Sequence, residues 1–122
     1  SSAASDVYKR QSNYYGLLDS RHGPMVMIGK TTLVIASIGG AGEQECKLVA
    51  DVAKKYATIV TFSDEPKDLP KVYANISFGR PLDLIGRGLA LIVICQLASY
   101  YKALVRGVNP DAPTGLDAWI KL

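Results

Sequence analysis

The feature that most constrains this 122-residue chain is a strand–helix–strand pattern in its first half. Residues 33–38, LVIASI, are mostly apolar and rich in β-branched side chains, and they predict a buried strand before a glycine-rich turn at 39–42. Residues 43–56 predict a helix, and residues 58–62, TIVTF, predict a second strand. Because parallel strands need a long crossover, a helix between two strands is typical of parallel pairing. The pattern therefore predicts an α/β domain.

The second half of the chain adds one strand and one long helix to this prediction. Residues 74–78 predict a third, short strand, and residues 82–106 predict the longest helix. Between the second and third strands, residues 63–71 are rich in proline and acidic side chains and predict a surface loop. Three strands are fewer than a doubly wound sheet normally has. We therefore expect further elements of this sheet to lie upstream of the sequence.

The helix expected at 43–56 is amphipathic. Glutamates stand in its first turn and lysines in its last turn, which suits the helix dipole at both ends. Its apolar face consists of Cys46, Val49, Ala53 and Tyr56.

Composition and charge exclude several classes of function. The chain is 48% hydrophobic, which is too apolar for a disordered tail. Its net charge of +3 comes without any run of lysine or arginine, so nothing suggests nucleic-acid binding. Cys46 and Cys95 lie among apolar residues and predict reduced core side chains of a cytoplasmic protein. There is no His/Cys cluster for zinc, and we expect neither a metal nor a cofactor.

Residues 1–11 differ from the rest of the chain. They are small and polar, with no initiator methionine and no apolar region of a signal peptide. The string resembles the translated read-through of a sequencing adapter, with residues 6–11 as its recurrent tail. We therefore expect residues 1–11 to be non-native and disordered, and residues 12–122 to form the domain. A natural disordered N-terminus is the alternative.

The helix expected at 82–106 is apolar on every side over residues 89–95, so a membrane span is one interpretation. Asp83, Arg87 and Gln96 keep the uninterrupted apolar stretch well below the about 18–20 residues that a span needs. A helix that is apolar all round is more often buried between a sheet and a partner domain. We therefore expect no association with membranes.

The strongest candidate for chemistry is the segment that contains the single histidine, His22. Imidazole titrates near neutral pH and can both accept and donate a proton. Gly23 and Pro24 form a rigid corner that would hold the histidine and let a ligand approach the backbone. Asp19 and Arg21 lie beside it in sequence. A structural or idle histidine in a loop is the alternative.

Three weaker candidates each have a simpler interpretation. Residues 37–42, SIGGAG, could cradle a phosphate, but they match no nucleotide-binding spacing and are more typical of a permissive turn. The acidic side chains of residues 64–68 lack the spacing of a cation site and suit a solvated loop. Residues 100–102, Tyr-Tyr-Lys, could stack on a ligand, although packing is the commoner role.

Several motifs, at this separation, together resemble a known family. They are Leu-Asp-x-Arg-His-Gly-Pro-Met at 18–25, Arg-Pro-Leu at 80–82, Gln-Leu-Ala-Ser-Tyr-Tyr at 96–101, Arg-Gly at 106–107 and Asn-Pro-Asp-x-Pro-x-x-Leu at 109–116. The chain from residue 14 to residue 122 resembles the sugar isomerase (SIS) domain. More narrowly, it is similar to the second SIS domain of glutamine–fructose-6-phosphate aminotransferases and related amino-sugar phosphate deaminases and isomerases.

The resemblance implies a flavodoxin-like, three-layer α/β sandwich, of which this sequence would be a truncated C-terminal portion. It implies binding of a phosphorylated sugar or amino sugar, an N-terminal SIS domain in the same chain, and a homodimer. His22 matches the histidine that assists opening of the sugar ring. Asp19, Arg21 and Gly23 are the substrate-binding candidates around it, and Asp19 stands where the family commonly has glutamate.

Two functional groups of the family have no match here. The base glutamate that moves a proton between the first two sugar carbons belongs to a helix upstream of the histidine, in a part of the family's chain that residues 1–11 replace. The Schiff-base lysine after the final leucine is also unmatched, because Asp117 and Ala118 follow Leu116. The departure disfavours a true aminotransferase. It favours a deaminase-like, deglycase-like or isomerase-like relative, and we expect the fragment to be inactive alone.

Two hypotheses follow from different classes of protein. The first is an enzyme that acts on amino-sugar or glycated sugar phosphates, with this chain as its C-terminal domain. The second is a phosphosugar-sensing SIS domain of a regulator, without turnover. Regulators of that type generally lack the His-Gly-Pro and Asn-Pro-Asp-x-Pro pair, which favours the enzyme.

Overall fold

The computed structural model describes residues 13–39, 42–109 and 111. The chain divides into two compact units. One runs from Tyr15 to Gly88, and the other comprises residues 1–14 with 89–122. The expected non-native segment at 1–11 and most of the motif at 109–116 lie outside the described residues.

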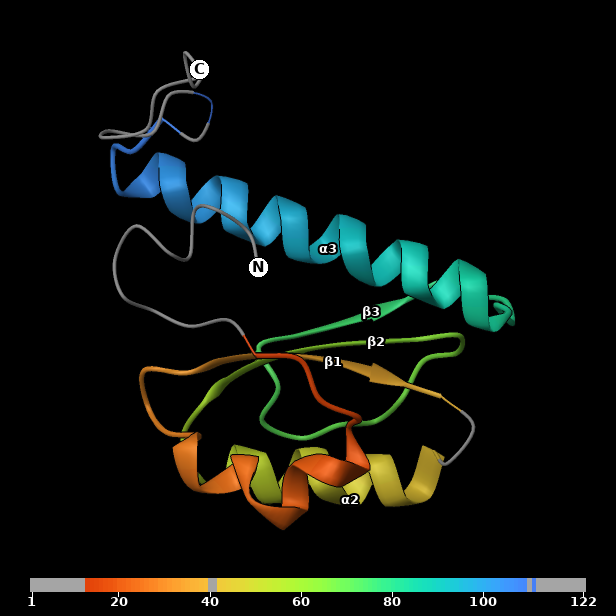
Figure 1. Cartoon of the computed structure of the whole chain (residues 1–122). Coiled ribbons are helices and arrows are strands. Elements are labelled where there is room, and N and C mark those ends of the chain that lie inside the picture. The colour runs from red at the N-terminus through yellow and green to blue at the C-terminus, as the bar shows by residue number, and fades with distance from the viewer. Residues whose placement is uncertain (1–12, 40–41, 110, 112–122) are drawn as a thin grey trace, which may run out of the picture. The chain divides into compact units, whose positions relative to one another are not determined.

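The first unit is built on a three-stranded parallel sheet in the order β1-β2-β3, as Figure 1 shows. Strand β1 is Leu33–Ile38, β2 is Thr58–Ser63 and β3 is Ala74–Ser77. The register places Leu33 beside Thr58 and Val60 beside Ala74. The α/β class and the parallel pairing predicted from the sequence are therefore confirmed.

Helix α2, Gly42–Ala53, covers one face of the sheet (Figure 1). The core cluster consists of Ala36, Ile38, Val49, Val52 and Ile59, with Cys46 and Ala53 packed against it. The predicted apolar face of the helix is thus right at three positions and wrong at Tyr56. That side chain is 74% exposed, because the helix ends at Ala53 and Tyr56 turns the chain with a left-handed φ of 63°.

The segment between β2 and β3, which was expected to be a surface loop, also contributes side chains to the core. It is the crossover between two parallel strands, and Leu69 and Val72 pack against the core cluster on the same face as α2. Asn75 ties this segment down, because its Nδ2 donates to the carbonyl of Lys67 at 2.7 Å. The buried Thr61 hydroxyl donates to Asn75 Oδ1 at 3.0 Å. The proline-rich segment therefore supplies part of the core in place of a crossover helix.

Two short 3-10 helices also lie on the α2 side of the sheet (Figure 1). Helix η1 is Leu18–His22 and helix η2 is Pro24–Met27, and Gly23 joins them. Leu17, Met25 and Ile28 pack against the core cluster and hold this segment in place.

Helix α3, Leu84–Val105, has a defined cap at each end. At its start, Asp83 Oδ1 accepts a hydrogen bond from the N–H of Gly86 at 2.6 Å, as an N-cap residue does. At its end, Gly107 has a φ of 68°, and the N–H of Val108 donates to the carbonyl of Ala103 at 3.0 Å. This is a Schellman motif, in which glycine takes the left-handed position.

Most apolar side chains of α3 are exposed, and Ala103 is its one buried residue. The described residues of its own unit therefore do not provide the burial expected for this helix. By length and composition alone, α3 could cross a membrane, which for a single helix is weak support. Its uncharged stretch runs from Gly88 to Tyr101, which is about 21 Å of helix against a hydrocarbon core of about 30 Å.

Candidate functional site

The His22 corner is defined here as residues 19–24, and its backbone is fixed by local hydrogen bonds. The hydroxyl of Ser20 donates to the carbonyl of Leu17 at 2.6 Å, and the N–H of Val26 donates to the carbonyl of Gly23 at 3.1 Å. Gly23 has a φ of 156° with a ψ of −59°, a combination that residues with a side chain rarely adopt. Pro24 starts η2. Glycine is therefore required where the chain reverses after His22.

An ion pair joins the His22 corner to α2. Arg21 Nη2 lies 2.8 Å from Asp51 Oδ2, and Lys54 Nζ lies 2.9 Å from Asp51 Oδ1. The hydrogen bond from Lys54, supported by the positive charges of Lys54 and Arg21, lowers the pKa of Asp51 below its ordinary value of 3.8. Arg21 is thus partly used in holding the corner, while its side chain remains 43% exposed.

His22 itself is exposed, and among the described residues it has no hydrogen bond, ion pair or ring contact. Its imidazole is accessible from solvent on a segment whose backbone is fixed. Asp19 lies in the same short helix, and its carboxylate folds back so closely on Gly16 that a Cβ there would collide with it. The four predicted site residues therefore lie on one corner, and the exposed side chain of His22 is accessible there.

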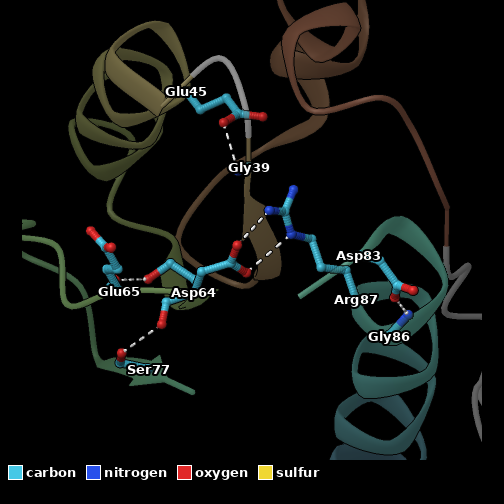
Figure 2. A network of polar contacts seen from close by, with 9 residues as sticks. Gly39, Glu45, Asp64, Glu65, Ser77, Asp83, Gly86 and Arg87 are labelled. Atoms are coloured by element: carbon cyan, nitrogen blue, oxygen red, sulfur yellow. Dashed lines mark hydrogen bonds and ion pairs between the residues drawn. The ribbon is translucent and has the colours of Figure 1, made fainter. Parts of the chain in front are cut away.

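A second polar cluster, which the sequence did not indicate, lies at the carboxyl edge of the sheet. Figure 2 shows Arg87, from the first turns of α3, facing Asp64 directly after β2. Arg87 Nε donates to Asp64 Oδ1 at 3.1 Å, and Nη2 donates to Oδ2 at 2.5 Å. This paired geometry is the strong form of an arginine–carboxylate contact. Asp64 is therefore an ion-pair partner, which corrects its interpretation as a solvated loop residue.

The Arg87–Asp64 pair shifts both groups towards their charged forms. The hydrogen bond from Arg87 lowers the pKa of Asp64, and a backbone hydrogen bond from Leu82 lowers it further. The hydrogen bond to Asp64 raises the pKa of Arg87, and the negative charge of Glu45 acts in the same direction. The network fastens the start of α3 to the end of β2.

The glycine-rich turn after β1 is partly closed by a carboxylate of the protein. Glu45 Oε2 accepts a hydrogen bond from the N–H of Gly39 at 2.7 Å (Figure 2). A Cβ at Gly39 would lie 2.8 Å from Arg87 Nη1, so the guanidinium also lies against this backbone. Residues 40 and 41 lie outside the described residues. The described part of this segment therefore favours a simple turn over a phosphate-binding loop.

Two tyrosines and two cysteines are the remaining candidate side chains in the described part of the chain. Tyr100 and Tyr101 meet edge to face with ring centroids 5.6 Å apart. Cys46 and Cys95 are free and half-buried, and burial raises the pKa of the Cys95 thiol. No group of three or more potential metal ligands occurs among the residues that the structure describes.

Sequence reasoning missed two partners that long-range folding brings in. Asp51 is thirty residues from Arg21, and Arg87 is 23 residues from Asp64. A signal existed for the second pair, because Asp64 follows a strand directly and Arg87 is the one charge inside the first turns of an apolar helix. No signal in the sequence marked Asp51.

No model of a known protein family matches the sequence, and no curated protein matches it at a significant level.

Proposed function

We propose that residues 12–122 belong to a phosphosugar-binding SIS domain of an enzyme that acts on amino-sugar or related sugar phosphates. The motifs around His22 and at 109–116 support the family, and the parallel α/β sheet is the fold class that the family requires. In this proposal the substrate is a phosphorylated sugar or amino sugar, and the reaction belongs to the isomerase or deaminase type. The free cysteines agree with a cytoplasmic location.

One observation carries the proposal, namely an exposed His22 on a corner that Gly23 and the Arg21–Asp51 ion pair hold in place. Opening a sugar ring requires that the anomeric hydroxyl loses a proton and that the ring oxygen gains one. Neutral imidazole can accept the first proton, and the imidazolium can deliver it to the ring oxygen as the anomeric carbon–oxygen bond breaks. No charge accumulates on the sugar, and His22 returns to its starting state.

The test compares turnover with binding in the enzyme that carries this domain. His22→Ala should lower turnover of ring-closed substrate by about 10²-fold or more, as expected for loss of a general acid–base group. It should change substrate affinity by less than about fivefold, because proton transfer by the imidazole stabilises the transition state rather than the bound ground state. Unchanged turnover would remove His22 from the mechanism. Substrate binding without any turnover in the parent protein would instead favour a phosphosugar sensor.

A further inference from the structure

A cluster of lysines lies at the amino edge of the sheet, on the opposite edge from Arg87 and Asp64. Lys30 precedes β1, Lys54 lies in the turn before β2, and Lys71 precedes β3. Because the three strands are parallel, their amino ends meet at one edge. Tyr56 lies among these lysines, and Lys30 Nζ is 5.5 Å from the centre of its ring.

Two of these lysines and Tyr56 line a shallow hollow that is widely open to solvent, called here the amino-edge hollow. It has a volume of about 480 Å³ and is lined by Ala53, Lys54, Tyr56, Ala57 and Lys71. The Lys54 side chain is 73% exposed and Tyr56 is 74% exposed. An aromatic ring and two exposed lysine side chains are therefore accessible in one place.

The backbone of the hollow is unusual at two of the three positions that carry its functional groups. Tyr56 and Lys71, with φ of 63° and 65°, are the non-glycine residues with positive φ in the described part of the chain. Such conformations cost free energy for residues with a Cβ, and they concentrate at functional sites. Asparagine or glycine at position 71 would adopt this left-handed backbone with less strain than lysine does. The turn alone therefore does not explain why the residue is a lysine.

The hollow also has an excess of positive charge. Lys54 shares Asp51 with Arg21, so one carboxylate serves two cations. Lys30 and Lys71 have no ion pair within the described residues. Compensation of the helix dipole accounts for Lys54 at the end of α2. It does not account for Lys30 and Lys71, which belong to other segments.

We propose that the amino-edge hollow binds a small phosphorylated molecule. The ammonium groups of Lys54 and Lys71 contact the phosphate, and the organic part of the ligand lies on the Tyr56 ring. The site is additional to the proposed function, because it shares no lining residue with the His22 corner. Failure of one proposal therefore leaves the other intact.

The test is an NMR titration of the 122-residue chain with phenyl phosphate, inorganic phosphate and phenol. Phenyl phosphate should shift the backbone amides of Lys54, Tyr56, Ala57 and Lys71, and it should bind more tightly than inorganic phosphate or phenol. Lys54→Gln and Lys71→Asn should each weaken binding by about fivefold. Asparagine suits the left-handed backbone at 71, so that variant keeps the fold. Tyr56→Asn should remove the preference for phenyl phosphate over inorganic phosphate.

The matched control is Lys47→Gln, which removes one charge from α2 at a position paired with Glu43, outside the hollow. It should change affinity by less than about twofold. Equal weakening in all three lysine variants would show unspecific attraction by net charge and would overturn the proposal. So would the absence of saturable shifts at the hollow up to about 10 mM phenyl phosphate.

Discussion

Gly23 shows how a single residue determines the His22 corner. Its backbone has φ 156° and ψ −59°, yet no atom lies within 4 Å of the place where a Cβ would stand. A substitution there would therefore meet backbone strain and no collision. The corner that presents His22 depends on the conformational freedom of glycine.

Gly23→Ala should destabilise the chain by about 1–3 kcal/mol, which is the cost of a backbone conformation that alanine rarely adopts. Urea unfolding measures this change. The matched control is Gly29→Ala, since Gly29 also has open space around its Cβ position but an ordinary φ. Equal free energies of unfolding for the two variants would show that the Gly23 conformation is not a constraint.

Asp64 should make the stability of the chain acid-sensitive. Arg87 holds its folded-state pKa below 3.8, so the ion pair stabilises the fold fully above about pH 5. This contribution is lost as the pH falls below 3.8 and through the lowered pKa. Asp64→Asn should therefore flatten the dependence of the urea midpoint on pH in the acid range. If the urea midpoints of the wild type and the variant changed with pH in the same way, the stabilising role of the Asp64–Arg87 ion pair would be contradicted.

At this scale the sequence predicted that Gly23 forms a corner beside His22, and the backbone of Gly23 confirms it. The sequence could not predict Asp51, because ion-pair partners thirty residues apart depend on how η1 docks on α2. The same limit explains why Asp64 was assigned to a solvated loop. Its partner comes from a later helix.

At the scale of elements, the ends of the helices are set by single residues. Helix α3 begins where Asp83 accepts a hydrogen bond from Gly86 and ends where Gly107 takes a left-handed φ. Helix α2 ends three residues earlier than its hydrophobic pattern predicts, because Tyr56 takes the left-handed position that glycine usually fills.

Asp83→Ala should weaken the start of α3 by about 1 kcal/mol through loss of the N-cap. Hydrogen exchange of the amides in the first turn should become faster, with little change near Ala103. Asp83→Ser is the control, because serine is also a good N-cap residue, and it should behave like the wild type. Faster exchange in both variants would mean that the carboxylate acts through its charge rather than as a cap.

The strands were more predictable than their connections. Strand β1 has the predicted bounds, and β2 and β3 each differ by one residue at the end. A buried strand is marked by a continuous β-branched run, which needs no knowledge of its neighbours. The crossover between β2 and β3 was not predictable, because prolines and acidic residues conceal the contribution of Leu69 and Val72 to the core.

At the scale of the whole molecule, the unit that contains residues 89–122 leaves a large amount of apolar surface on α3 uncovered by its own described residues. Leu89, Ile92 and Leu97 are each more than half exposed. Monomeric soluble domains rarely expose contiguous apolar surface of this kind.

The isolated chain should therefore self-associate in a concentration-dependent manner, which sedimentation velocity measures. Replacing Leu89 and Ile92 together by Gln should reduce association, since Gln is a good helix former and removes only apolar surface. Lys102→Gln, at another exposed position of α3, should leave association unchanged. A wild-type chain that stays monomeric at high concentration would contradict this prediction.

The most direct test of phosphosugar binding at the His22 corner uses the fact that His22 is the single histidine of the chain. Its imidazole proton signals can be followed by NMR without assignment while hexose 6-phosphates and the corresponding free hexoses are added. The test is repeated in Lys71→Asn, which separates the His22 corner from the amino-edge hollow. A saturable shift with the phosphorylated sugar, weak or absent with the free sugar and retained in Lys71→Asn, is the predicted result. If the imidazole signals shift with neither sugar, the proposed function is contradicted.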